Sequence, residues 1–482
     1  MIQEKSNNQL TNWELVSVNP SNKIWNWKDL FCFWGNSLQS IIGFSLVASL
    51  YLLYNLNFVL VFASLLSAGF LVIIFSNIIG SISQKHGLPF PAILRISMGV
   101  KAAKYVAMSR GIVALIMFGI QTYFLSKAIG FLFRVIFFSI DNGLLDNELF
   151  LLFFMGMNLL DWFSLFLTII LQVTFFSIGH LYNKKIINFS AYFVYFGLFL
   201  FSLIVFSETP EIPMKIFHDL FAFENLISME NLVPYISVTG TMFAYFSILI
   251  LNFGDFSRYV KNNSELKKGN LSLLLNIILF SIFSIFIVVM SDNYFGGLDK
   301  ILTNPMDIIG KFDNLYLSFI SLIFIIIASF STNLIANYIP AQNTLINFAP
   351  KALNIKNVSF IIGVSGLIIG STWLVFLSQS GILSLIDTLG SLFGPIFGVV
   401  ILDYFYLKNK IVNNKDLYSL DSSAEYYFTY GWHIKAIYSL LIGFIFSAST
   451  IWNLEFQFLQ SYSWFIGAIM ASFVYYLLSN KN

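Results

Sequence analysis

Apolar stretches of membrane-spanning length recur along the whole chain, and they constrain its fold more than any other feature. A helix of about 20 apolar residues crosses the roughly 30 Å hydrocarbon core of a bilayer. Twelve such windows lie near residues 30–54, 58–80, 107–133, 159–179, 187–206, 233–256, 271–291, 315–340, 357–377, 382–405, 435–452 and 460–478. Because hydrocarbon offers the backbone no hydrogen bonds, segments of this length and composition must be helical. We therefore expect an all-α polytopic membrane protein with about twelve transmembrane helices.

The composition agrees with this fold class and excludes several kinds of protein. Of 482 residues, 57% are hydrophobic and only 10% are charged, which is outside the range of soluble domains. The net charge of +2 leaves no basic surface for nucleic acid. Cys32 is the single cysteine, so the chain forms no internal disulfide, and its four histidines lack the spacing of metal ligands.

The distribution of Lys and Arg sets the expected orientation. Residues 1–29 are polar and show no signal-peptide cleavage site, so we interpret them as a cytoplasmic tail. With this tail inside, 21 of the 26 Lys and Arg residues fall in cytoplasmic segments and five fall outside, in line with the positive-inside rule. We therefore expect both termini in the cytoplasm and the protein in the plasma (inner) membrane.

Three windows carry polar runs that hydrocarbon tolerates only where they serve a cavity, another helix or a solute. They are residues 34–40 in the first window, 237–241 in the sixth, and 328–333 followed by Asn337 in the eighth. The offset of five helices suits two inverted repeats, residues 30–206 and 233–405, with two additional helices in 435–478. Residue identity between the two halves is weak, so this pattern alone leaves the repeat open.

Five motifs follow one another in a defined order. They are Lys85 to Arg95, Phe118 to Thr122, Asn252 to Arg258, Ser331 to Asn337, and Gly394-Pro395 with Asp403 to Phe405. Together they resemble the nucleobase-cation symport-1 family, which includes hydantoin, allantoin, cytosine, uracil and purine transporters. The resemblance implies a leucine-transporter-type fold of five plus five helices in inverted repeat, with discontinuous helices 1 and 6. It also implies alternating access around a site at the midplane.

The resemblance further implies a sodium site between the first and eighth spans. Its ligands would be the main-chain carbonyls of Gly35, Leu38 and Ala328 and the hydroxyls of Ser331 and Thr332. The spacing supports this independently, because residues at i, i+3 and i+4 share one helical face. In the alternative reading, both hydroxyls merely bond to carbonyls one turn earlier, as serine and threonine often do in spans.

The substrate positions implied by the resemblance are Gln39, Met117, Gln121, Tyr245, Phe246, Asn333 and Asn337. Carboxamides offer a donor and an acceptor, which match the adjacent N–H and C=O groups of a nucleobase or hydantoin. Many relatives clamp the ring between two tryptophans, whereas this chain has Met117 and Phe246 there. Tyr245 narrows the expected pocket and favours a small single ring. The amides could instead act only as hydrogen bonds between helices.

The expected function is secondary active uptake of a nucleobase or related heterocycle, of the uracil, cytosine, allantoin or hydantoin class, coupled to sodium. The alternative is a proton-coupled carrier of the same fold for a purine or a vitamin-like heterocycle, although the sequence indicates no titratable midspan group near the site. No catalytic triad or phosphate loop indicates an enzyme, and we expect no cofactor besides the coupling sodium. We expect a monomer whose partners are the heterocycle, sodium and membrane lipid.

Overall fold

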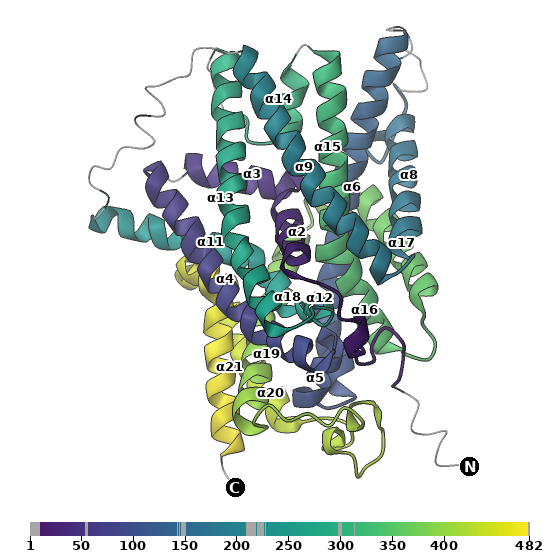
Figure 1. The fold of residues 1–482 in the computed structure, drawn as a ribbon, viewed down its shortest axis with the longest axis vertical. Helices are drawn as coiled ribbons and strands as arrows, with labels where there is room; N and C mark the ends of the chain where they lie inside the picture. Colours follow the sequence, from purple (N-terminus) through teal and green to yellow (C-terminus); the bar gives the residue numbers. More distant parts are fainter. Residues whose placement is uncertain are drawn as a thin grey trace.

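Long helices run side by side along the long axis of the molecule (Figure 1). The structure, a computed structural model, describes residues 10–53, 56–141, 143, 145, 151–208, 218, 226, 228–296, 301–312 and 314–480. The longer helices are α4 (Phe58–His86), α6 (Ala102–Ile140), α8 (Leu159–Phe176), α9 (His180–Glu208), α11 (Met229–Leu251), α13 (Asn263–Tyr294), α15 (Leu315–Asn333), α17 (Ile355–Thr372), α20 (Ile434–Trp452) and α21 (Ser463–Ser479).

Shorter elements interrupt or connect these helices. The α-helices among them are α2 (Trp27–Leu38), α3 (Ile41–Leu53), α5 (Phe90–Met98), α12 (Gly254–Ser257), α14 (Pro305–Lys311), α16 (Ile339–Phe348), α18 (Ile382–Gly390) and α19 (Phe393–Leu402). The π-helical turns are η3 (Leu334–Tyr338), η4 (Trp373–Leu377) and η5 (Asp403–Leu407), and the 3-10 turns are η1 (Pro20–Asn22), η6 (Asp416–Tyr418), η7 (Glu425–Tyr427) and η8 (Leu454–Tyr462). Strands β1 (Phe153–Phe154) and β2 (Met157–Asn158) form a small antiparallel hairpin.

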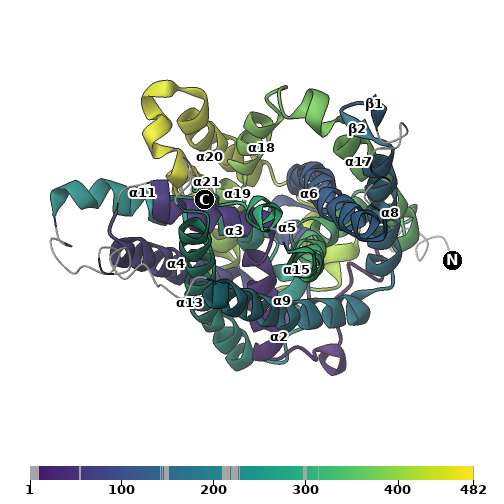
Figure 2. The same ribbon diagram turned by 90° about the horizontal axis from the view of Figure 1, so that it is seen from above.

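Every predicted window coincides with a helix or with consecutive helices, so the predicted set of spans is confirmed. Among the described residues, eleven helices are long and apolar enough to cross a membrane, and the bent pair α2 and α3 makes a twelfth span. The segment before α2 and the C-terminal end of α21 lie at the same end of the molecule (Figure 1), as an even number of spans requires. Helices α19, α20 and α21 pack together at one side of the bundle (Figure 2).

The first span is broken between α2 and α3, which meet at 71°. The last turn of α2 is closed by Gln39, whose backbone N–H donates to the carbonyl of Gly35 across 3.1 Å. A Cβ atom on Gly43 would lie 2.1 Å from the carbonyl oxygen of Leu38, so the backbone can turn this sharply only because Gly43 has no side chain. The break therefore falls inside the polar run 34–40, as the sequence predicts.

The sixth span is discontinuous at a different place from its polar run. Residues 237–241 do not interrupt α11, because the hydroxyls of Thr239 and Thr241 bond to carbonyls one turn earlier and the helix continues to Leu251. The discontinuity lies at Asn252 and Phe253, between α11 and α12.

The eighth span changes its winding where its polar run ends. Helix α15 ends at Asn333, the π-helical turn η3 follows, and α16 continues the span to Phe348. A π-helical turn inserts one extra residue per turn and rotates the side chains that follow it, and such turns are frequent at functional sites. The turn contains Asn337, one of the predicted substrate residues.

The chain before α2 is packed against the helical bundle from Leu10 onward. Leu10 and Leu15 are buried, and the hydroxyl of Tyr418 donates to the carbonyl of Leu15 across 2.8 Å. The guanidinium of Arg95, on α5, donates to the carbonyl of Leu10 across 3.3 Å. Composition alone indicated a polar tail for residues 1–29, and its described part is tied to the end of the molecule at which α21 ends.

Candidate functional site between the broken first span and the eighth span

The polar runs of the first and eighth spans contact each other inside the bundle. The hydroxyl of Thr332 on α15 donates to the main-chain oxygen of Asn36 on α2 across 2.6 Å. The hydroxyl of Ser331 donates to Oδ1 of the same asparagine across 2.5 Å. All three residues are buried. Neutral oxygens thus gather beside the break in the first span, and this donor chemistry suits a hard monovalent cation.

Three of the five predicted cation ligands, Ala328, Ser331 and Thr332, lie at this contact. The hydroxyl oxygens of Ser331 and Thr332 are each 3.0 Å from the carbonyl oxygen of Ala328, one turn earlier on α15. Gly35 is in the last turn of α2, and Leu38 is the last residue of that helix. The distances to Ala328 are also those of simple hydrogen bonds within a helix. They are therefore compatible with a cation site and with the alternative in which both hydroxyls only bond to a carbonyl one turn earlier.

Three of the predicted substrate amides form one hydrogen-bonded chain. The Nδ2 atom of Asn337 lies 3.1 Å from Oε1 of Gln121 on α6 and 2.9 Å from Oδ1 of Asn333. The Nδ2 atom of Asn333 in turn lies 3.1 Å from the hydroxyl oxygen of Thr122, on α6. The third and eighth spans are therefore joined by carboxamides at the level of the candidate cation site.

A cavity of about 380 Å³ lies next to this chain of amides. Met117, Gln121, Tyr245 and Asn337 line it, and so does Thr332, which also contacts Asn36. Ligand sites of this size hold small organic molecules and combine apolar walls with a few polar groups. The cavity reaches Gln460, Ser461, Ser463 and Trp464, where η8 ends and α21 begins.

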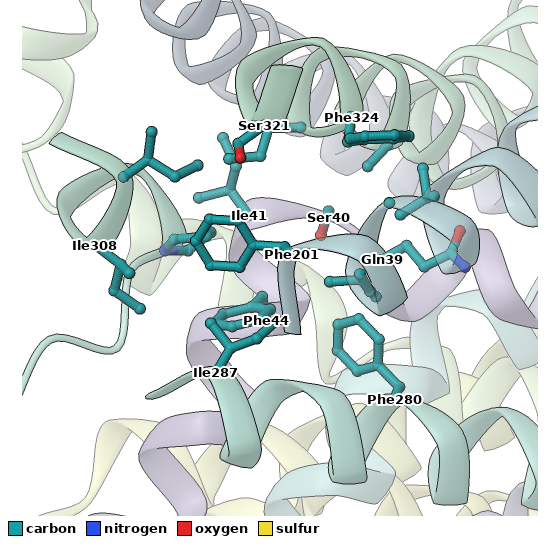
Figure 3. Close-up of a pocket in the computed structure, with 17 residues that line it drawn as sticks. Gln39, Ser40, Ile41, Phe44, Phe201, Phe280, Ile287, Ile308, Ser321 and Phe324 are labelled. Atoms are coloured by element: carbon teal, nitrogen blue, oxygen red, sulfur yellow. The ribbon is translucent and has the colours of Figure 1, made fainter. Parts of the chain in front are cut away.

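Three predicted substrate residues do not line the large cavity. Asn333 is fully buried behind Asn337, and Phe246 is fully buried with its ring 6.0 Å from that of Trp34. The amide of Gln39 donates to the carbonyl of Ala191 on α9 across 3.2 Å. The side chain of Gln39 instead borders a second, apolar cavity of about 60 Å³ between α3, α9, α13 and α15 (Figure 3).

Tyr245 closes the large cavity toward the break in the first span. Its hydroxyl donates to the carbonyl of Ser37 across 2.5 Å. The ring lies 5.4 Å from that of Phe246, edge to face. Tyr245 thus lies between the large cavity and α2, and it bonds to a backbone group next to the break.

Two residues at the site were absent from the sequence-based selection. Asn36 lies within the polar run 34–40, but its own side chain gave no separate signal. Asp387, on α18, lines the large cavity and is exposed. The expectation that no titratable group lies near the site is therefore wrong. The available signal was the acidic residue inside an apolar window, because charges within spans are rare and usually functional.

Comparison with known proteins places this geometry in a family. Residues 17–476 match the family model described as permease for cytosine/purines, uracil, thiamine and allantoin. The chain is 26% identical to the allantoin permease of Bacillus subtilis over 494 residues, which cover 98% of this chain and 94% of that protein. It is 24% identical to the purine-uracil permease NCS1 of Arabidopsis thaliana over 489 residues, which cover 98% of this chain and 78% of that protein.

Solved structures confirm the leucine-transporter-type fold. The chain superposes on the nucleobase-cation-symport-1 family transporter Mhp1, in a closed conformation with bromovinylhydantoin bound, with a TM-score of 0.75 and 16% identity. That match covers 97% of this chain and 94% of Mhp1. A Na⁺-coupled sialic acid symporter matches with a TM-score of 0.61 and 12% identity, covering 95% of this chain and 91% of that one. The chain belongs to the nucleobase-cation symport-1 family of permeases for cytosine/purines, uracil, thiamine and allantoin, and it is a transporter rather than an enzyme.

Proposed function

We propose that this permease takes up a small heterocycle of the uracil, cytosine, allantoin or hydantoin class together with sodium, by alternating access. One observation carries the proposal. Asn36, Ala328, Ser331 and Thr332 form an oxygen cluster beside the break in the first span. Thr332 belongs to this cluster and also lines the large cavity, so a ring beside Asn337 and a cation beside Thr332 would be neighbours. Two ligands that both stabilise the contact between α2 and α15 raise each other's affinity, and this coupling is reciprocal.

The substrate class is supported by the relatives and by the chemistry of the cavity. Permeases named for allantoin and for purines and uracil match nearly the whole chain. The side chains of Gln121 and Asn337 present both donors and acceptors to the cavity, which suits the adjacent N–H and C=O groups of these rings. A ring lacking those groups would leave buried amides unpaired, at a cost of about 1–3 kcal/mol each.

Sodium coupling supplies the driving force in this proposal. One charge moved down a potential of about 100 mV releases about 2.3 kcal/mol. At about 1.4 kcal/mol per tenfold change, that energy sustains roughly a fifty-fold gradient of a neutral substrate. We place both termini in the cytoplasm, so that the cavity end lined by Gln460, Ser461, Ser463 and Trp464 is the external one.

Uptake into liposomes tests the proposal. The purified protein would be reconstituted and offered labelled uracil, cytosine, allantoin and hydantoin, with sodium outside and with potassium replacing it. We expect at least one of these rings to accumulate only with sodium, and more strongly when the interior is negative. Equal uptake in sodium and in potassium would overturn the sodium proposal while leaving the family assignment intact.

A second candidate function has one specific observation in its favour. Asp387 lines the large cavity, and a carboxyl group there could carry a proton into the transport cycle. The protein would then be a proton-coupled carrier for a purine or a vitamin-like heterocycle. Uptake driven by a lowered external pH at fixed sodium concentration would support this second function over the first.

A further inference from the structure

Asn36 joins three elements of the bundle through one side chain. It is fully buried at the end of α2. Its Nδ2 atom lies 2.8 Å from the carbonyl oxygen of Cys32 in the same helix and 2.7 Å from that of Ile187 on α9. Its Oδ1 atom accepts from Ser331 on α15, and its main-chain oxygen accepts from Thr332. None of the predicted site residues in the described part of the chain bonds to both α9 and α15.

These partners determine which way the amide faces. An amide nitrogen carries two protons and no free acceptor, and two carbonyl oxygens lie on the nitrogen side of Asn36. The reverse orientation would set Oδ1 against both carbonyl oxygens with no proton between them. The oxygen of the amide therefore faces the hydroxyl of Ser331.

The direction of the hydroxyl protons decides what the oxygen cluster can bind. Each hydroxyl has one proton and two lone pairs. The proton of Ser331 can go to Ala328 at 3.0 Å or to Asn36 at 2.5 Å, and that of Thr332 to Ala328 at 3.0 Å or to Asn36 at 2.6 Å. The shorter distance favours Asn36 in both cases. The carbonyl of Ala328 and the hydroxyl lone pairs then remain available to a cation.

We propose that Asn36 is a positioning residue of the cation site, which accepts the hydroxyl protons of Ser331 and Thr332 so that their lone pairs face the ion, and which ties the site to α9. This inference rests on the proposed sodium coupling. The bond to the carbonyl of Ile187 makes α9 sensitive to the state of the site, because a shift of α2 away from α15 moves the same amide. Asn36 itself need not touch the cation.

Two substitutions of similar size separate this role from simple packing. Asn36→Leu removes the acceptor for Ser331 and keeps the side chain's approximate volume, whereas Asn36→Asp keeps an acceptor at that position. We expect Asn36→Leu to raise the sodium concentration for half-maximal effect at least about tenfold. Asn36→Asp keeps the acceptor but sets an oxygen against the carbonyls of Cys32 and Ile187, so it should raise that concentration less than Asn36→Leu does. Asn270→Leu is the matched control, because Asn270 is also buried and contacts α2 through Trp34 but does not touch the hydroxyls.

Two measurements would be made on each purified protein. The first is the rise in melting temperature with added sodium, with potassium as the reference salt. The second is the sodium dependence of uptake in liposomes. Asn36→Leu combined with Ser331→Ala should weaken the sodium response little more than Ser331→Ala alone, because Asn36 acts through that hydroxyl. The substrate affinity of Asn36→Leu at saturating sodium should change less than about threefold. A purely structural defect would instead lower both the sodium response and the substrate affinity.

The outcomes distinguish this inference from the function on which it rests. A wild-type protein that responds to sodium, together with an unchanged sodium response in Asn36→Leu, would overturn the role of Asn36 alone. Fully additive effects of Asn36→Leu and Ser331→Ala would overturn it as well. A wild-type protein without any sodium response would overturn both the sodium coupling and this inference. If Asn36→Leu fails to fold, an unchanged sodium response in Asn36→Ala, which also removes the acceptor for Ser331, contradicts the proposed role.

Discussion

The amide nitrogen of Asn337, on the π-helical turn η3, lies 3.1 Å from Oε1 of Gln121 on α6. The same nitrogen lies 2.9 Å from Oδ1 of Asn333. Both protons of the Asn337 amide are therefore used within the protein, so the group that Asn337 offers to a ring is its Oδ1 atom, an acceptor, and the group that Gln121 offers is its amide nitrogen, a donor. A ring with an adjacent N–H and C=O satisfies both groups, whereas a ring without them leaves both unpaired, so the two residues select among heterocycles.

Removing either partner of this pair should weaken substrate binding. We expect Asn337→Ala and Gln121→Ala each to lower affinity for the transported ring at least about tenfold, because one hydrogen bond in a desolvated pocket contributes on the order of 1–3 kcal/mol. Competition against a labelled substrate in liposomes measures this. Asn183→Ala is the control, since Asn183 is buried and bonds to the carbonyl of Phe176 away from the large cavity. Affinities equal to the wild type in both variants would remove these residues from the substrate site.

The hydroxyls of the oxygen cluster should be needed for sodium stimulation. Ser331→Ala together with Thr332→Ala removes two of the five predicted cation ligands and both donors to Asn36. We expect uptake by this variant to lose its dependence on sodium, as measured with sodium and potassium gradients of equal size. Ser329 lies on the same helix and is buried, but its hydroxyl bonds to neither Asn36 nor Ala328, so Ser329→Ala should keep the sodium dependence of uptake. Sodium stimulation that survives in the double variant would show that the cation binds elsewhere.

The size of the transported ring should depend on Tyr245. Tyr245→Leu shortens the side chain that bounds the cavity and removes the bond to the carbonyl of Ser37. We expect purines to compete at least about tenfold better, relative to uracil, in this variant than in the wild type. Tyr245→Phe keeps the ring and loses only the hydrogen bond, so its preference should match that of the wild type. An unchanged preference for uracil over purines in Tyr245→Leu would mean that another part of the cavity wall limits the size of the ring.

Substitution of Asp387 should distinguish sodium coupling from proton coupling. It is exposed at the wall of the cavity, so Asp387→Asn removes a titratable group with little change in packing. Under sodium coupling, we expect sodium-driven uptake to stay within about threefold of the wild type. Measurement of uptake under an imposed pH gradient, without sodium, completes the comparison. Uptake that is driven by protons in the wild type and lost in Asp387→Asn would favour the second candidate function.

His433, just before α20, should make the fold sensitive to mild acid. Burial, followed by the nearby Lys408 and Lys435, lowers the pKa of His433 below its usual 6.5, although its bond to the carbonyl of Ser97 raises it. Below about pH 6.5 the unfolded chain therefore binds a proton here more readily than the folded protein, so this contribution to stability is lost as the pH falls.

Melting temperatures between pH 7.5 and 5.5 test this effect. We expect His433→Gln, which cannot titrate and can still donate to Ser97, to lose less stability across this range than the wild type. A pH dependence in His433→Gln as steep as that of the wild type would rule out this histidine as its source.

The spans and the motif order could be predicted because they depend on local composition. About 20 apolar residues suffice to specify a membrane helix whatever its neighbours, and the twelve windows correspond to helices. The exact place of the interruptions was less predictable. Residues 34–40 do contain a break, whereas Thr239 and Thr241 bond within α11 and leave it intact. The same residue types serve either purpose, so composition alone cannot separate a break from a satisfied polar turn.

The sequence by itself determined that this chain crosses the membrane about twelve times and carries carboxamides and hydroxyls on its first, third and eighth spans. Only the tertiary structure decided which of them meet. It brought Asn337 to Gln121 and Asn36 to Ser331, and it turned Gln39 toward α9 instead of the large cavity. Side-chain direction depends on the bend between α2 and α3 and on the winding of η3, and both result from packing between helices distant in sequence.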